Sequence, residues 1–324
     1  MNHPPPTSGR AIECALALAP GLAERAGETE RTRAVPAESW HELHASGLMR
    51  ILQPRRVGGA ELPFATLVEV SAVLARACGS TAWVFGNLAS HQWMLGMWPA
   101  AAQHEVWGPA GETAATPIAA SLIFPAGRAC REGAGWRLSG RWSFVSGVES
   151  CGWIMLGAVA VDDEDAPLGE KHGEYRLYLL PREDYEVRDT WQVVGLAGTR
   201  SDEVIVRDKW VPEHRTLALA DTQGGPTPGA ALNPGPLYRI PLLATFGYVV
   251  AGVPIGLAEG MLKLFTDENR SRLASYSGRA LADFPAIQAK LAEAAALADC
   301  ARALALRRCE EIMQLAVGGA SPEL

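Results

Sequence analysis

The sequence lacks the features that mark metal-binding, nucleic-acid-binding and membrane proteins. Its six cysteines form no Cys-x-x-Cys pair and its seven histidines are scattered, so we expect no metal site. The 29 Lys and Arg against 36 Asp and Glu leave no basic footprint for nucleic acid. We also expect no membrane span, because no apolar run looks long enough, and a cytoplasmic location, because the N-terminus lacks an apolar signal core.

Motifs of several common enzyme classes are missing as well. The chain has no Walker loop, dinucleotide fingerprint, HExxH or GxSxG. Its closest glycine motif, at 195–199, is flanked by expected strands on both sides, which does not suit a nucleotide-binding turn. The 48% apolar and 20% charged composition is that of a globular protein.

Hydrophobic periodicity divides the chain into helices, then strands, then helices. Helical spacing covers residues 11–25, 38–44, 64–77, 81–95 and 99–107, and Pro20 is expected to kink or split the first helix. Short β-branched or aromatic runs follow at 118–124, 136–138, 142–145, 153–161, 175–180 and 203–206. Two long helical patterns close the chain, at 237–265 and 284–317.

This order predicts an α+β protein of three parts. We expect an N-terminal helical domain (1–114), a middle antiparallel β-barrel or sandwich (115–220), a Gly/Pro-rich linker (221–236) and a C-terminal helical bundle (237–324). Two helices cannot close a bundle alone, so we expect the last two to pack on another subunit or on further helices.

Three polar residues in apolar surroundings are candidates for chemistry. His91 lies in an apolar helical segment and could be a general base or hydrogen-bond donor, or a satisfied core histidine. Ser146 ends a strand and is followed by Gly147, which suits contact with a flat cofactor; the alternative is a turn serine. Ser121 begins another strand-like run, where a structural role is the alternative.

Six segments carry a family resemblance: residues 90–93, 105–108, 140–147, 189–191, 195–201 and 211–215. Together they resemble flavin-dependent oxygenases built on the acyl-CoA dehydrogenase fold. The likeness spans roughly residues 35–320. Within the family, the sequence is similar to the oxygenase components of p-hydroxyphenylacetate hydroxylase and seco-steroid phenol hydroxylase. It implies the helical, β and helical domains of that fold, assembled as a homotetramer.

The resemblance also implies an activity. A separate NAD(P)H-dependent reductase would supply reduced FMN or FAD, which reacts with O₂ to form a flavin C4a-hydroperoxide. That species would hydroxylate an aromatic or phenolic small molecule, or oxidise an amine. The cofactor performs the redox chemistry, and the protein orients the partners and excludes water.

Site roles carried over by position are expectations of the same kind. Ser146 matches a hydroxyl that reaches flavin N5, and Phe144 an aromatic residue beside the flavin ring. His91 and Ser121 match residues that contact substrate or flavin, so His91, Ser121 and Ser146 are the expected catalytic residues. The expected substrate pocket contains His91, Trp93 and Ser121. The expected cofactor-binding set is Phe144, Ser146, Gly147, Thr199, Arg200, Arg270 and Arg272.

Two alternatives stay open. An FAD-dependent acyl-CoA dehydrogenase needs a carboxylate to remove an α-proton, and one position used in that family falls near Phe246, which is not acidic. A catalytically impaired homologue that binds flavin or serves as a scaffold is the other. The oxygenases place a second histidine in closing helices, and no residue of this sequence matches it.

Overall fold

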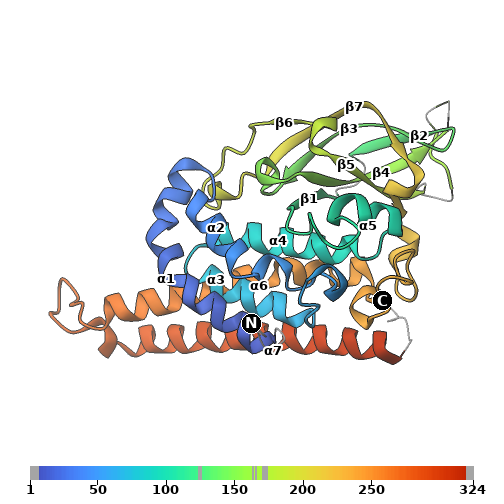
Figure 1. Cartoon of the computed structure of the whole chain (residues 1–324). Coiled ribbons are helices and arrows are strands. Elements are labelled where there is room, and N and C mark those ends of the chain that lie inside the picture. Colours follow the sequence, from blue (N-terminus) through green and yellow to red (C-terminus); the bar gives the residue numbers. More distant parts are fainter. Residues whose placement is uncertain (1–6, 123–125, 163, 165, 170–173, 319–324) are drawn as a thin grey trace.

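The computed structural model describes residues 7–122, 126–162, 164, 166–169 and 174–318. A β-sheet covers one side of a helical layer, and two long C-terminal helices run along the opposite side (Figure 1). The helices before the sheet are α1 (Ser8–Thr32), α2 (Ala37–Ala45), α3 (Ala65–Ala75), α4 (Gly79–Leu95) and α5 (Ala100–Trp107). The expected helices of this region are therefore confirmed, with one difference in α1.

Helix α1 continues through Pro20 instead of splitting there. It is capped at its start by the Thr7 side chain and ends at Arg33, whose φ of 55° lies in the left-handed region. The helix packs against α3, and its buried residues lie both before and after Pro20, so the missing N–H does not end it.

Helices α3 and α4 form the centre of the helical layer. Almost every residue of α4 from Ser80 onward is buried, polar ones included, because α3, α6 and the sheet enclose it. A helix that is apolar on all sides is expected in this central position.

The β part is one mixed sheet. Its strands are β1 (Ile118–Ser121), β2 (Gly127–Glu132), β3 (Gly135–Val145), β4 (Trp153–Val161), β5 (Tyr175–Pro181), β6 (Glu186–Arg188), β7 (Asp202–Pro212) and β8 (Thr216–Ala218). The order is β6-β7-β3-β2-β4-β5-β8, with β1 beside β4.

The expected antiparallel barrel or sandwich is corrected by this topology. Strands β1 and β2 both pair with β4 in parallel, and among the described residues the end strands β6 and β8 do not pair. Chain connections, which strand patterns do not encode, set the parallel pairs. The predicted run 118–124 ends as β1 at Ser121, and its residues 123 and 124 lie outside the described ranges.

The expected linker is packed against the helical layer through its single asparagine, Asn233. The Asn233 side-chain amide donates to the Gly96 carbonyl at 2.7 Å and to Gln103 Oε1 at 2.9 Å. A short 3₁₀ turn, Pro236–Arg239, then leads into the C-terminal helices. This segment is thus held in place by α4 and α5.

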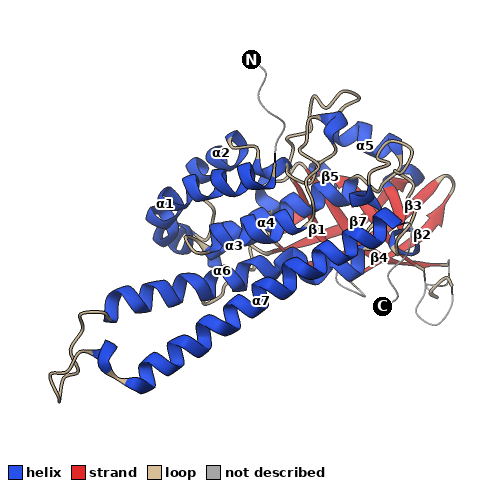
Figure 2. Cartoon of the chain, turned by 90° about the horizontal axis from the view of Figure 1, so that it is seen from below, coloured by secondary structure: helices blue, strands red, loops and turns tan. Residues whose placement is uncertain are grey.

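The last two helices are α6 (Leu242–Asn269) and α7 (Pro285–Gly318), which lie antiparallel (Figure 2). The expectation that no run approaches a membrane span is wrong for α6, because residues 240–258 are uncharged and its length and hydropathy suffice. The helix packs against α3 and α4, and 39% of its most apolar window is buried.

Candidate active site

A cavity of about 430 Å³ lies where helix α4, the sheet and helix α6 meet. It is lined by Trp83, Asn87, His91, Ala120, Ser121, Leu122, Phe144, Ser146, Trp191, Leu196, Thr199, Ser201, Phe246 and Val250. A larger hollow of about 680 Å³ lies between α6 and α7, but Lys290 is the one titratable side chain among its described lining residues. The smaller cavity therefore has the chemistry of a site.

Buried hydroxyl groups form a connected chain at one wall. The Trp83 indole Nε1–H donates to Ser146 Oγ at 2.9 Å. Ser146 Oγ lies 2.8 Å from Ser201 Oγ, which lies 2.8 Å from Thr199 Oγ1. Each of these three hydroxyls is at most 7% exposed, so their hydrogen bonds are made within the protein.

His91 is a neutral hydrogen-bonding group. Its Nδ1 lies 2.7 Å from the carbonyl oxygen of Ile118, and a carbonyl can only accept, so Nδ1 carries the hydrogen. Nε2 is then left with a lone pair. Burial lowers the pKa of His91 to about 4, which keeps the ring uncharged at neutral pH.

Strand β3 ends in an irregular turn that presents two site residues. The register of β3 with β7 shifts between Trp142 and Val145, and Phe144 there has a φ of 62°. Such a conformation is strained for a residue with a side chain and is common at functional sites. It leaves Phe144 60% exposed, edge-on to Trp191 with 5.9 Å between ring centroids.

Gly147 follows with a φ of 68°, and a Cβ there would lie 2.9 Å from Val84 Cγ1. Only glycine fits this turn against α4 without strain. On the neighbouring strand, Ser121 Oγ donates to the Ser143 carbonyl at 3.2 Å, so its hydrogen is also used within the protein.

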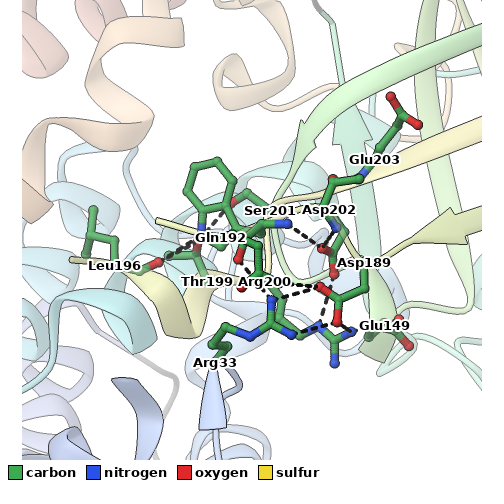
Figure 3. Close-up of polar contacts among 12 residues, drawn as sticks. Arg33, Glu149, Asp189, Gln192, Leu196, Thr199, Arg200, Ser201, Asp202 and Glu203 are labelled. Atoms are coloured by element: carbon green, nitrogen blue, oxygen red, sulfur yellow. Dashed lines mark hydrogen bonds and ion pairs between the residues drawn. The ribbon is translucent and has the colours of Figure 1, made fainter. Parts of the chain in front are cut away.

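A cluster of charged side chains holds the loop that carries Trp191 (Figure 3). Arg33 of α1 donates to both carboxylate oxygens of Asp189, at 2.8 and 2.6 Å. The fully buried Asp202 accepts from the backbone N–H groups of Thr190 and Trp191 and from Arg200 Nε. The loop is thereby fixed from both the helical layer and the sheet.

Most of the predicted site residues lie at this one cavity. His91, Ser121, Phe144, Ser146 and Thr199 all line the cavity, and Gly147 adjoins it. These residues come from α4, β1, the end of β3 and the turn before β7. Segments far apart in sequence thus meet at one cavity.

Four predicted residues lie elsewhere. Trp93 is two residues past His91, which turns its side chain about 200° around α4 into the core; it packs edge-on to Phe64 and donates to the Leu237 carbonyl. Arg200 pairs with Asp202 instead of lining the cavity. Arg270 and Arg272 follow the end of α6, roughly 30 Å along the helix from Val250.

Several lining residues were not predicted as site residues. Trp83 and Asn87 precede His91 by eight and four residues, so one face of α4 carries all three, and this spacing could have identified them. Trp191 and Ser201 lie inside resemblance segments but were given no role. Phe246 stands in the cavity wall itself.

None of the described residues lining the cavity is Asp or Glu. A carboxylate that could remove the α-proton of an acyl thioester is therefore not present in this wall, and Phe246 occupies the position considered for it. The polar side-chain groups of these residues are hydroxyls, one amide, two indole N–H groups and a neutral imidazole.

Comparison with known proteins agrees with this geometry. Residues 17–110 match the acyl-CoA dehydrogenase N-terminal domain, and residues 248–323 match the C-terminal domain. The FADH(2)-dependent resorcinol hydroxylase oxygenase component of Rhizobium sp. (strain MTP-10005) is 36% identical over 87% of this chain and 68% of its own length. The oxygenase subunit HsaA of Rhodococcus jostii, a flavin-dependent monooxygenase, is 32% identical over 94% and 78%.

Solved structures match the whole architecture. The 3-HSA hydroxylase from Rhodococcus sp. RHA1 superposes with a TM-score of 0.88 at 30% identity, over 97% of this chain and 78% of that one. XiaF from Streptomyces sp., solved with FADH2, gives a TM-score of 0.86 at 27% identity, over 98% and 78%. The chain therefore belongs to the flavin-dependent monooxygenase oxygenase components of two-component systems, built on the acyl-CoA dehydrogenase fold.

Proposed function

We propose that this oxygenase hydroxylates a small phenol with O₂, using reduced FMN or FAD supplied by a separate NAD(P)H-dependent reductase. The observation that carries the proposal is the cavity lining, which combines aromatic walls with neutral hydrogen-bonding groups and no described carboxylate. Relatives named for phenolic substrates, such as resorcinol hydroxylase and p-hydroxyphenylacetate 3-hydroxylase, support the substrate class. Amine oxidation is the next candidate.

The residues present fit a flavin ring. Trp83, Phe144, Trp191 and Phe246 give the cavity flat apolar surfaces, and Ser146 offers a hydroxyl where a ring nitrogen can approach. When bound, the reduced flavin supplies the electrons that activate O₂. In this proposal Phe144 lies beside the ring, Ser146 contacts N5, and Gly147 and Thr199 shape the adjoining backbone.

His91 and Ser121 are the proposed substrate contacts. Because Nδ1 of His91 is committed to the Ile118 carbonyl, Nε2 can accept a hydrogen bond from a phenol O–H. The neutral ring orients the phenol through this hydrogen bond. Ser121 Oγ, whose hydrogen is given to Ser143, offers a second acceptor. The apolar lining keeps bulk water away from both.

Assembly and location complete the proposal. Large apolar side chains are exposed along α6 and α7, among them Leu243, Met261, Leu264, Leu297 and Leu304, which supports packing of these helices in a homotetramer. In that assembly Arg270 and Arg272 would contact flavin phosphate in a neighbouring copy, since they lie far from their own cavity. We propose that the enzyme lies in the cytoplasm, where NAD(P)H and a reductase are available.

The test is isotopic. The purified chain is mixed with a flavin reductase, NADH, FMN or FAD, ¹⁸O₂ and either resorcinol or 4-hydroxyphenylacetate. We expect a hydroxylated product that carries one ¹⁸O atom by mass spectrometry. Reduced flavin that reoxidises with no labelled product from any phenol or amine tested would reject the proposal. A chain that binds neither flavin state would instead favour the scaffold alternative.

A further inference from the structure

The hydroxyl chain beside the cavity ends in two groups of opposite character. At one end the indole N–H of Trp83 can only donate, and it points to Ser146 Oγ. At the other end the backbone carbonyl of Leu196 can only accept, and it lies 3.0 Å from Thr199 Oγ1. Between them stand the three hydroxyls of Ser146, Ser201 and Thr199, each with one hydrogen to give. Figure 3 labels Leu196, Thr199 and Ser201 of this chain of hydroxyls.

Counting these hydrogens gives the chain a direction. Thr199 gives its hydrogen to the Leu196 carbonyl, so the 2.8 Å contact with Ser201 needs the hydrogen of Ser201. The 2.8 Å contact between Ser201 and Ser146 then needs the hydrogen of Ser146. Ser146 thus gives its hydrogen to Ser201, another residue of the cavity wall, and receives one from Trp83.

One lone pair of Ser146 Oγ remains for a ligand in the cavity. The reverse direction would let Ser146 donate into the cavity, but it would place Thr199 Oγ1 against the Leu196 carbonyl at 3.0 Å with no hydrogen between them. The Leu196 carbonyl also accepts from the indole N–H of Trp191 and the backbone N–H of Thr199. Both bonds exist in either direction, so neither replaces the hydrogen bond that the Thr199 hydroxyl would lose. The reverse direction therefore has one hydrogen bond fewer.

We propose that this directed hydroxyl chain makes the cavity select the reduced over the oxidised flavin. The inference rests on the proposed function, in which the flavin N5 lies at Ser146. Reduced flavin carries N5–H, which can donate to the lone pair of Ser146. Oxidised flavin presents a lone pair at N5 and would need a hydrogen that the chain has committed to Ser201. Ser201 and Thr199 are thus positioning residues that act through Ser146.

Breaking the hydroxyl chain should reduce the preference for reduced over oxidised flavin. In Ser201→Ala, Ser146 loses its acceptor inside the protein, and its hydrogen becomes free for oxidised flavin. In Thr199→Val, Ser201 can turn its hydrogen toward Ser146, with the same result. Both variants should bind oxidised flavin about two- to tenfold more tightly, the value of one neutral hydrogen bond, while reduced-flavin affinity changes less.

The experiment measures Kd for reduced and oxidised FMN and FAD under anaerobic conditions by flavin fluorescence and calorimetry, with no substrate turnover. Thr222→Val is the matched control, since Thr222 is also buried and donates to a leucine carbonyl, at 2.8 Å, away from the cavity. Thr199→Ser keeps the hydroxyl and should restore the wild-type ratio of the two Kd values. Ser201→Ala still tests the hydroxyl chain if the valine variant fails to fold.

The outcomes separate the two proposals. A fall of the oxidised-to-reduced Kd ratio in both chain-breaking variants, but in neither Thr222→Val nor Thr199→Ser, supports the inference. A ratio that stays at the wild-type value in all variants overturns it while leaving flavin binding intact. A wild-type chain that binds neither flavin state overturns the proposed function, and this inference with it.

Discussion

Arg33 and Asp189 lie 156 residues apart in the sequence and are joined by two hydrogen bonds. Arg33 terminates α1 in a left-handed conformation, and Asp189 opens the loop that carries Trp191 into the cavity wall. Arg33 Nη1 also donates to the Trp191 carbonyl at 3.1 Å. The position of an aromatic side chain in the site therefore depends on the end of the first helix.

Replacing Arg33 should make Trp191 and Phe144, two aromatic residues of the cavity wall, less firmly positioned. In Arg33→Gln the carboxylate of Asp189 loses the guanidinium that binds both of its oxygens. The loop that carries Trp191 is then less fixed, so Trp191 and its neighbour Phe144 should bind the flavin less firmly. More reduced flavin should then end as H₂O₂ instead of hydroxylated product, and turnover should fall by up to roughly 10²-fold. Arg10→Gln, which breaks the exposed Arg10–Glu13 pair on the same helix, is the control. Equal product yields in both variants would contradict this role.

The buried His91 predicts a pH dependence of stability. Its pKa is about 4 in the folded chain and about 6.5 when unfolded, so the unfolded chain binds more protons between these values. The free energy of unfolding should then be independent of His91 above about pH 6.5 and fall by up to about 3 kcal/mol as pH drops to 4. Urea unfolding at several pH values measures this.

His91→Gln removes the titrating group and should flatten that part of the curve. His44→Gln, where burial also lowers the histidine pKa, is the matched control and should keep the contribution of His91. Wild-type and His91→Gln curves that stay parallel from pH 7 to pH 4 would show that His91 is not the group responsible.

The turn at Gly147 should tolerate no side chain. Gly147→Ala places a Cβ 2.9 Å from Val84 Cγ1 in a left-handed conformation, so it suffers both a clash and backbone strain. Gly195 has a φ of 78° and nothing within 4 Å of an added Cβ, so Gly195→Ala suffers the strain alone. We expect losses of about 2 kcal/mol or more for Gly147→Ala and about 1 kcal/mol for Gly195→Ala.

Urea denaturation compares the two glycine variants directly. Gly147→Ala should also weaken flavin affinity, because Ser146 precedes the strained residue. Equal losses of stability would mean that the contact with α4 is easily relieved.

Phe246 should limit the size of the substrate. It contributes the C-terminal part of the cavity wall, and its truncation enlarges the space beside Val250. Phe246→Ala should raise kcat/KM for a bicyclic substrate such as indole-3-acetate relative to resorcinol by roughly tenfold. Phe265→Ala, a similarly exposed phenylalanine on the same helix but outside this cavity, should leave the ratio unchanged. An unchanged ratio in Phe246→Ala would place the substrate elsewhere.

Local patterns in the sequence were enough to predict the helices, whereas they left structural roles open for His91 and Ser146, which only the family resemblance pointed to as site residues. His91 and Ser146 stand out because each is a polar group in an apolar run, and the structure brings both to one cavity. Trp93 was grouped with His91 by nearness in sequence, although a turn of 200° separates their side chains. Spacing along α4, which points to Trp83 and Asn87, is the better guide.

Long-range pairings were not readable in the same way. The parallel neighbours of β4 depend on chain connections, and no single strand encodes its partner. The sequence does not show that Arg200, an expected cofactor-binding residue, pairs with Asp202, because it is the fold that buries Asp202. The contact between Ser146 and Ser201 joins residues 55 positions apart.

The cavity wall takes residues from α4, from the sheet and from α6, so no one part of the chain holds a complete site. A bound ligand consequently favours the state in which all three parts are docked. By mass action, ligand at 100 times its Kd adds about 2.7 kcal/mol to that state. Saturation should therefore raise the melting temperature, and occupancy of the site becomes a measure of how firmly the helices and the sheet hold together.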